Sequence, residues 1–229
     1  MGDVNNLPII AVLGGTGKEG KGLVYRWAKS GYRVLIGSRS QQKADTVANE
    51  LLDLLGGKAL IEGASYHAAV MRSNIIALTV PYAAHREALE SIKEGMKGKL
   101  LIDVTVPLVP PRVTRVKMPT AGSAAQEALE ILGEEAQVTS AFQNISSEFL
   151  LQDKQVECDV LVAGTSKEAR SETIKLVTAA GLTGWDAGPI ENSAVVEGLT
   201  SILIGINKQF GSKSAGIQIT GVKAAARNS

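Results

Sequence analysis

Two short clusters near the start of the chain contain the residue types that bind nucleotide phosphates. Gly15, Gly17 and Gly20 follow the apolar run 8–13 and precede a helical pattern. In this strand-to-helix setting, the G-x-G-x-x-G spacing predicts a dinucleotide-binding turn. The glycines permit a tight turn and let the backbone approach a diphosphate, which the N-terminus of the following helix stabilises. We therefore expect a diphosphate at this turn.

The second cluster indicates which dinucleotide binds. The apolar run 32–36 leads into Gly37, Ser38 and Arg39, and Lys43 follows on the next predicted helix. A site for NAD usually has Asp or Glu about 20 residues past the glycines, where it binds the ribose 2′-hydroxyl. Hydrogen bonds to charged groups contribute roughly 1.5–3 kcal/mol each, so the cluster would favour a 2′-phosphate by about 3–5 kcal/mol. The sequence therefore predicts NADP; the alternative is a turn in which Arg39 is simply solvated.

Strand and helix patterns alternate around these clusters, which favours a doubly wound α/β fold with a parallel Rossmann sheet. The apolar runs 74–80 and 100–106 stop at Pro81 and Pro107, as expected of buried parallel strands whose chain leaves the sheet there. Ligands bind beyond the carboxyl ends of such strands, so both proline turns should lie near the two clusters, along the path of the nicotinamide. Further strands are expected at 59–63 and 137–142, and helices at 40–55, 64–72 and 123–132.

The pattern loosens from about Asn144. We therefore expect an NADP-binding Rossmann domain at residues 1–143 and a small α/β C-terminal domain at residues 144–229. The last predicted helix, 192–210, carries a broad apolar face, more than a small domain can bury internally. We predict a homodimer that uses part of this face. The C-terminal elements expected are strands at 158–163, 183–187 and 216–221 and helices at 167–180 and 192–210.

Composition and charge exclude several other classes of protein. Hydrophobic residues make up 45% of the 229 positions, which is ample for a core, and 24 basic and 23 acidic residues leave a net charge of +1 without a basic stripe. We therefore expect no nucleic acid and no membrane as partner. No apolar run approaches the ~18 residues of a membrane span, and the N-terminus does not resemble a signal peptide. The single cysteine, Cys158, fits a reducing environment and is expected to pack in a strand, so the predicted location is cytoplasmic.

The sequence contains no evident general acid or base and no metal-ligand cluster. His67 and His85 are expected to be surface or structural, Asp103 to make a structural hydrogen bond, and Trp27 and Trp185 to lie in the core. The missing acid or base is informative, because a hydride can pass directly between two flat rings held face to face at about 3–3.5 Å. Such a transfer needs small residues around the rings more than a catalytic side chain. The absence would thus fit a redox coenzyme as the second substrate, and we predict no catalytic side chain and no metal.

The chain resembles the deazaflavin-dependent NADP oxidoreductases, the NADPH:coenzyme F-420 reductases, nearly from end to end. The glycine turn, Gly37-Ser38-Arg39 and the two proline turns belong to the shared pattern, and the stretch Asp186-Ala187-Gly188-Pro189 is more specific than the glycines. One position departs from the pattern. Gln143 stands where archaeal members carry His, in a segment that lies by the deazaflavin in that family.

The resemblance implies reversible, direct hydride transfer between NADP(H) and coenzyme F-420, an 8-hydroxy-5-deazaflavin. It also implies that the protein is a dimer and that the C-terminal domain holds the deazaflavin site and the dimer contacts. Together with Gly15, the cofactor-binding residues that it implies are Thr16, Gly17, Lys18 and Glu19 at the diphosphate, Ser38, Arg39 and Lys43 at the 2′-phosphate, Val80, Val106 and Ser147 on the nicotinamide side, and Ala215 near the ring stack.

Two other functions stay open at this point. One is an NADPH-dependent reductase of another acceptor, such as a flavin, a quinone, a metal chelate or an imine. The other is a non-catalytic NADP(H)-sensing module. The region after the Rossmann unit is too short for the all-helical substrate domain of imine and β-hydroxyacid reductases.

Overall fold

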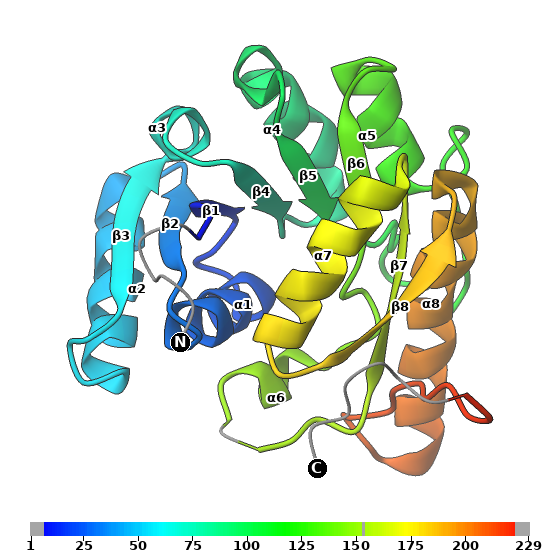
Figure 1. Ribbon diagram of the computed structural model, residues 1–229. Coiled ribbons are helices and arrows are strands. Elements are labelled where there is room, and N and C mark those ends of the chain that lie inside the picture. The colour runs from blue at the N-terminus through cyan, green and yellow to red at the C-terminus, as the bar shows by residue number, and fades with distance from the viewer. Residues whose placement is uncertain (1–6, 153, 223–229) are drawn as a thin grey trace.

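The structure is a computed structural model that describes residues 7–152 and 154–222. Strands and helices alternate along most of the chain (Figure 1). The strands are β1 Ile10–Leu13, β2 Arg33–Ser38, β3 Leu60–Ser65, β4 Ile75–Leu78, β5 Leu100–Asp103, β6 Gln137–Ser140, β7 Asp159–Gly164 and β8 Thr183–Gly188. The α-helices are α1 Lys18–Lys29, α2 Gln41–Leu54, α3 Tyr66–Met71, α4 His85–Ile92, α5 Ala124–Leu132, α6 Ser147–Leu150, α7 Lys167–Ala179 and α8 Ser193–Phe210. Short 3-10 helices lie at η2 Tyr82–Ala84, η3 Lys93–Met96 and η4 Ile190–Asn192.

The strands of the described chain form one sheet in the order β3-β2-β1-β4-β5-β6-β7-β8. Neighbouring strands are parallel, except that β6 and β7 are antiparallel. The strand order reverses at β1, whose Leu13 lies beside Gly37 of β2 on one side and Leu78 of β4 on the other. The predicted doubly wound Rossmann sheet is confirmed. In such sheets ligands bind in the crevice at the switch point, here beyond the end of β1.

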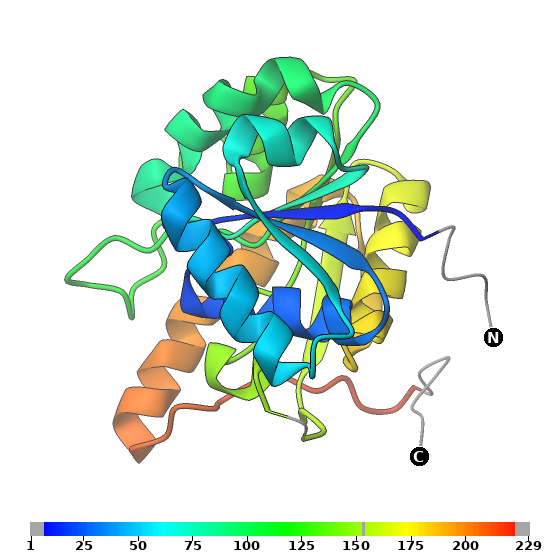
Figure 2. The ribbon, with the colours of Figure 1, turned by 90° about the vertical axis from the view of Figure 1, so that its left-hand side faces the viewer.

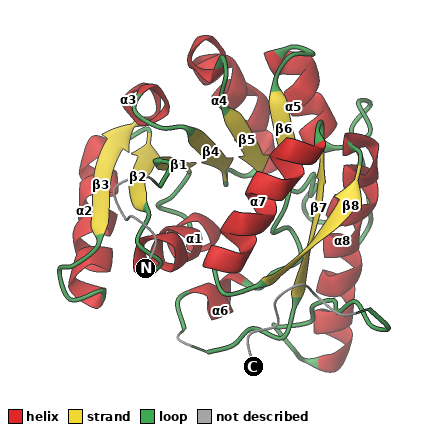
Figure 3. Ribbon diagram, in the orientation of Figure 1, coloured by secondary structure: helices red, strands yellow, loops and turns green. Residues whose placement is uncertain are grey.

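Two apolar layers cover the sheet, because alternate residues of each strand face opposite sides. Ile10 and Val12 of β1 join a core with α1, α2 and α7, whereas Ala11 and Leu13 join a second core with α3, α4 and α5. Figure 2 shows these helix groups on the two sides of the sheet, and Figure 3 shows the same layers with helices and strands distinguished by colour. The long helix α8 packs beside α5 and β7.

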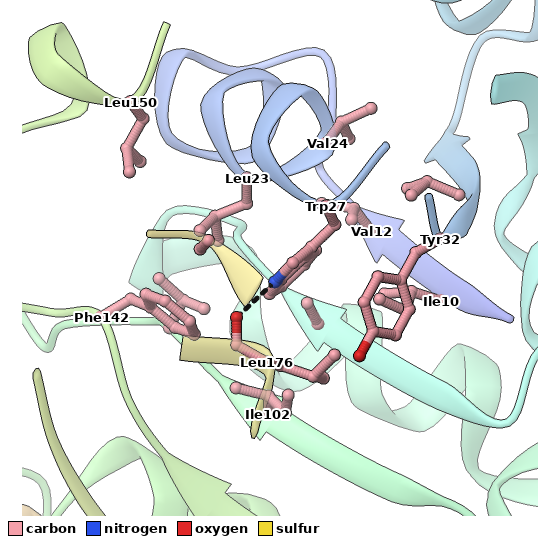
Figure 4. Close-up of a cluster of buried hydrophobic side chains, with 14 of the residues drawn as sticks. Ile10, Val12, Leu23, Val24, Trp27, Tyr32, Ile102, Phe142, Leu150 and Leu176 are labelled. Atoms are coloured by element: carbon pink, nitrogen blue, oxygen red, sulfur yellow. Dashed lines mark hydrogen bonds between the residues drawn. The ribbon is translucent and has the colours of Figure 1, made fainter. Parts of the chain in front are cut away.

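The first core anchors α1, and with it the glycine turn. Trp27 of α1 is fully buried, and its indole N–H donates to the carbonyl oxygen of Leu176 at 2.9 Å (Figure 4). Its ring meets that of Phe142 edge to face, with 5.8 Å between the ring centroids, a pairing that contributes about 0.5–1.5 kcal/mol. The predicted core position of Trp27 is confirmed. The predicted core position of Trp185 is wrong, because this residue is partly exposed and its indole N–H donates to the Asp159 carboxylate at 2.8 Å.

The C-terminal region extends the same sheet rather than building a separate one, because β7 pairs with β6 and β8 pairs with β7. Cys158, just before β7, is buried as predicted. The strand predicted at 216–221 does not form. The Asp159 N–H donates to the carbonyl of Ile217 at 2.8 Å, but the N–H of Ile219 donates to the Asp159 carboxylate, also at 2.8 Å, so no ladder continues. The division into domains at residues 143 and 144 stays a prediction.

Candidate active site

A cavity of about 1340 Å³ lies beyond the carboxyl ends of β1, β2, β4, β5 and β6. It is larger than the 300–1,000 Å³ typical of single-ligand pockets. Of the residues predicted to bind the cofactor, Gly15 is buried within the glycine turn and does not line the cavity. The others line it: Thr16, Gly17, Lys18, Glu19, Ser38, Arg39, Lys43, Val80, Val106, Ser147 and Ala215. The contacts of these residues with a cofactor stay a prediction.

The glycine turn after β1 is a close-packed cradle that side chains would fill. A Cβ atom on Gly15 would lie 2.8 Å from the carbonyl oxygen of Val12, and one on Gly20 would lie 2.5 Å from Oγ1 of Thr79. Gly17 is the N-cap of α1 and has no side chain to bond the N–H groups of the first turn. These groups are therefore available to an anion, which the positive end of the helix dipole also favours. The cradle fits a diphosphate.

Basic residues gather at the end of β2, on the same wall of the cavity. Ser38 ends β2 and accepts a hydrogen bond from the N–H of Ser40 at 3.2 Å, while the Ser40 hydroxyl caps α2 by accepting from the N–H of Lys43 at 3.4 Å. This turn brings Ser38, Arg39 and Lys43 together at the N-terminus of α2. Neither Arg39 nor Lys43 forms an ion pair within the described ranges 7–152 and 154–222. Two cations beside an anion-binding helix end suit a phosphate monoester.

The far wall of the cavity comes from the turns after β4 and β5, from α6 and from α8. The short helix α6 lies directly on α1, because a Cβ on Gly22 would be 2.4 Å from that of Leu150. The guanidinium of Arg26 fixes the chain around α6 by donating to the carbonyl oxygens of Leu150 at 2.8 Å and Phe149 at 2.9 Å. Ser147, at the start of α6, is thereby held against the cavity. Ala215 is held there by its N–H, which donates to the side chain of Asn207 in α8 at 2.9 Å.

The turn after β6 contributes Gln143 to the cavity wall. Phe142 adopts a φ of +75°, a left-handed conformation that costs about 1–3 kcal/mol in a residue other than glycine. The amide nitrogen of Gln143 donates to the carbonyl of Asp103 at 2.7 Å and to the hydroxyl of Ser140 at 2.9 Å. Because a carbonyl only accepts, these bonds fix the orientation of the amide, and Gln143 forms a rigid part of the cavity wall.

Behind this wall lies a buried polar network that the sequence does not reveal. His85 Nε2 lies 2.7 Å from Oδ2 of Asp103, and both side chains are fully buried. Burial lowers the pKa of His85, but the carboxylates of Asp103 and Glu127 raise it more, and the pKa stands above its ordinary value. Tyr82 donates to Glu127 at 2.9 Å. Neither His85 nor Asp103 is among the described residues that line the cavity. The predicted structural role therefore fits both side chains, which are more deeply buried than we expected.

Two further glutamates are buried near the site. The carboxylate of Glu197 in α8 accepts the N–H groups of Ala124 at 2.7 Å and Ala125 at 3.1 Å, at the start of α5. Burial and the nearby Asp103 raise its pKa to about 8, although these hydrogen bonds lower it. Glu19 differs, because its Oε1 is buried without a hydrogen-bond partner, although the residue retains some exposure to the cavity. Burial raises its pKa to about 8 as well.

Other kinds of site find no support in the described part of the chain. No group of three or more His, Cys, Asp or Glu residues among positions 7–152 and 154–222 is placed to hold a metal ion. His67 is exposed at the cavity. None of the helices in the same ranges is long and apolar enough to cross a membrane.

The switch-point cavity, the glycine cradle and the basic cluster together define a Rossmann protein with a site for a phosphorylated dinucleotide. Comparison with known proteins identifies the family. Residues 9–107 match the family described as NADP oxidoreductase, coenzyme F420-dependent. The chain is 36% identical over 222 residues to the F420-dependent NADP reductase of Methanocaldococcus jannaschii, covering 93% of this chain and 99% of the relative. It is 37% identical over 218 residues to the enzyme of the same name from Methanothermobacter thermautotrophicus, covering 92% and 94%. The chain belongs to the family of F420-dependent NADP reductases.

Solved structures show the same fold at lower sequence identity. A protein of Arthrobacter sp. FB24, whose proposed activity is F420-dependent NADP reduction, has a TM-score of 0.77 at 22% identity, over 93% of this chain and all of that one. An imine reductase from Myxococcus stipitatus in complex with NAD+ has a TM-score of 0.61 at 20% identity, over 90% of this chain but only 63% of that enzyme. These two structures therefore support the fold of the chain.

Proposed function

We propose that this protein transfers a hydride directly and reversibly between NADP(H) and the deazaflavin coenzyme F420. The observation that carries the proposal is the large cavity at the switch point. It is lined by the glycine turn and the basic cluster, whose groups suit phosphates, and also by small and apolar residues such as Val80, Val106 and Ala215. Its volume of about 1340 Å³ exceeds what one ring system needs. Family membership supports the identity of both coenzymes, because the relatives are F420-dependent NADP reductases.

The residues that would hold NADP divide by the chemistry that they offer. The N–H groups at the start of α1, around Gly17 and Lys18, would bind the diphosphate. Arg39 and Lys43 would bind the 2′-phosphate, and Val80, Val106 and Ser147 would border the nicotinamide. When bound, NADPH supplies the hydride, and the reduced deazaflavin takes up one proton in addition. The protein's contribution is to hold the two rings face to face at about 3–3.5 Å and to exclude water.

The domain assignment belongs to the same proposal. Residues 1–143 would bind NADP, and residues 144–229 would supply the deazaflavin side and the contacts between subunits. Ala215 and Ser147 both lie in the second range and both line the cavity, which supports this division of roles. We also place the protein in the cytoplasm, where its single buried cysteine would stay reduced.

We further propose a homodimer formed by the outer stripe of α8, which consists of Val195, Ile202, Ile206 and Phe210. These side chains are 67%, 52%, 39% and 73% exposed, and their spacing places them along one side of the helix. The opposite side of α8 lines the cavity with Thr200 and Ile204 among others. A partner subunit on the stripe would therefore support the wall of the site.

Light scattering tests the assembly. We expect about 48 kDa at micromolar concentration, twice the 24.0 kDa of one chain, and a monomer for Ile202→Glu. Leu54→Glu on α2 is the matched control, because Leu54 is equally apolar and 59% exposed but lies outside the stripe. A monomeric wild-type protein would exclude the dimer without affecting the proposed reaction.

One assay tests the reaction. Purified protein is mixed with NADPH and coenzyme F420, and loss of the absorbance of the oxidised deazaflavin is followed, with NADH as the control donor. We expect turnover with NADPH and at most weak turnover with NADH. Turnover only with a flavin, a quinone, a metal chelate or an imine would assign another acceptor. NADPH binding without turnover of any of these would make the protein a sensor.

A further inference from the structure

Glu19 is an acid at a position where an anion is expected. It occupies the first turn of α1, directly after Gly17 and Lys18, and it is one of the residues that line the cavity. Its Oε1 is buried and has no hydrogen-bond partner. Buried polar atoms are normally paired, and an exception calls for an explanation such as a missing ligand. The diphosphate proposed for this turn carries negative charge, and an ionised Glu19 would repel it.

Among the described residues, no cation forms an ion pair with the carboxyl group of Glu19. On α1, Lys18 is exposed and Lys21 forms an ion pair with Glu50 of α2. The helix packed on this turn, α6, contributes the acidic Glu148. On α7, which contacts α1 further along, Lys175 pairs with Glu172. Burial is the cause that raises the pKa of Glu19 to about 8, so the carboxyl is mainly neutral at pH 7.

We propose that Glu19 binds NADP(H) as a neutral carboxylic acid whose O–H donates a hydrogen bond to the bound cofactor, so that its deprotonation weakens cofactor binding. The inference rests on the proposed NADP site and adds a role for one side chain in it. A protonated carboxyl has one O–H donor, and a hydrogen bond to an ionised phosphate oxygen is about twice as strong as one between neutral groups. The bound anion would in turn favour the protonated form. Binding above pH 8 therefore takes up a proton.

The matched control is Glu168. It stands in α7 where Glu19 stands in α1, one residue after a lysine in the first turn of the helix. Glu168 is exposed and does not line the cavity within the described chain. The two glutamates thus share their position in the helix and differ in burial and in access to the proposed ligand. Any general effect of pH or of charge at a helix N-terminus acts on both.

The experiment measures binding of NADP+ by calorimetry between pH 7 and pH 9, with two buffers of different ionisation enthalpy. We expect the wild-type Kd to be about tenfold weaker at pH 9 than at pH 7, with proton uptake approaching one per site at pH 9. Glu19→Gln keeps an N–H donor and removes the titration, so its Kd should be constant within about twofold over this range. Glu168→Gln should behave as the wild type. Thermal unfolding confirms that each variant is folded.

Two results would overturn the inference: a wild-type Kd that does not change between pH 7 and pH 9, or a Glu19→Gln variant that keeps the wild-type dependence. Either result would leave the proposed function intact if NADP+ still binds and NADPH still reduces the deazaflavin. Failure of the wild-type protein to bind NADP+ at pH 7 would instead reject the proposed function and this inference together. Glu19→Leu distinguishes loss of the hydrogen-bond donor from loss of the charge. Its Kd for NADP+ should also be independent of pH, but at pH 7 it should bind NADP+ more weakly than Glu19→Gln.

Discussion

Glu197 and Glu19 are two buried acids that differ in how their carboxyl groups are satisfied. Burial raises the pKa of each to about 8. Glu197 is fully buried, and its carboxyl accepts two backbone N–H groups at the start of α5, 2.7 Å and 3.1 Å away. Glu19 has a buried oxygen with no partner and lines the cavity. A perturbed acid is therefore not by itself a sign of function. Protein N–H groups satisfy the carboxyl group of Glu197, whereas we propose that a bound ligand satisfies that of Glu19.

The same contrast separates the two regions around these acids. The buried side chains of Glu197, Asp103 and His85 lie on α8, β5 and α4, are not among the described residues that line the cavity, and serve the fold. The glycine turn and the cluster of Arg39 face the cavity, where we propose that they bind NADP(H). Substitutions in the first region should therefore lower stability more than binding, and substitutions in the second should lower binding or turnover without affecting stability.

The largest effect is expected for Glu197→Ala. This change leaves the N–H groups of Ala124 and Ala125 buried without acceptors, and each buried unsatisfied group costs about 1–3 kcal/mol. We expect the free energy of unfolding to fall by about 2–4 kcal/mol, measured by urea titration at pH 7. NADP+ binding by the folded fraction should change by less than about threefold. A large loss of binding with unchanged stability would place Glu197 in the site and break the comparison.

The pH dependence of stability follows from the same pair of acids. Both Glu19 and Glu197 bind a proton more tightly in the folded protein, with a pKa of about 8, than in the unfolded chain, where it is 4.5. Their contribution to stability is therefore complete below pH 4.5 and is lost as the pH rises through about 8. Denaturant titrations at pH 6 and pH 9 should show a less stable protein at pH 9. Glu197→Gln should reduce this difference.

A bulky residue at the proposed ring contact should affect turnover without affecting the fold. Ala215 lines the cavity on an irregular segment, and Ser147 lines it at the start of α6. We expect Ala215→Trp and Ser147→Trp to lower kcat/KM for deazaflavin reduction by at least about a hundredfold, because the rings are forced beyond the distance for hydride transfer. Unfolding midpoints should stay within a few degrees of the wild type. Normal turnover in both variants would mean that the rings stack elsewhere.

Arg39→Ala tests the proposed contact between Arg39 and the 2′-phosphate of NADP(H). Only NADP(H) carries this group, so the change should weaken NADPH binding by roughly 1.5–3 kcal/mol and leave NADH binding almost unchanged. Fluorescence titration of the two reduced cofactors measures both values on one protein. Equal losses for NADPH and NADH would show that Arg39 does not bind the 2′-phosphate, and would favour the interpretation of this turn as a solvated loop.

The two regions also differ in how far the sequence predicts them. The glycine turn and the Ser38-Arg39-Lys43 cluster were predictable, because each lies within one strand–turn–helix unit whose spacing sets its geometry. The Glu197–Ala124 contact was not, because its partners are 73 residues apart and come together only when α8 packs on α5. His85 and Asp103, 18 residues apart, likewise carry no spacing signal. The strand predicted at 216–221 failed for a related reason, since the Asp159 carboxylate takes the Ile219 N–H and no ladder continues.

The smallest effect is expected at Tyr82, where the two regions meet. Tyr82 lines the cavity, and its hydroxyl donates to Glu127 at 2.9 Å. Burial and the bond to Glu127 raise its pKa to about 12, so the hydroxyl neither ionises near pH 7 nor is free to donate to a substrate. We expect Tyr82→Phe to keep kcat within about tenfold, below the 10²–10⁴ typical of a lost general acid or base, and to cost about 1 kcal/mol of stability.

Isotope transfer makes this last test decisive for the chemistry. If the rings exchange a hydride directly, the deuterium of stereospecifically labelled NADPH should appear on the deazaflavin in both the wild type and Tyr82→Phe, without washing out to solvent. Phe at this position leaves Glu127 without one donor, but Arg86 still donates to that carboxylate at 2.6 Å, so the cluster should stay folded. Loss of turnover in a folded Tyr82→Phe variant, or exchange of the label with solvent, would assign acid–base work to the region that we consider structural.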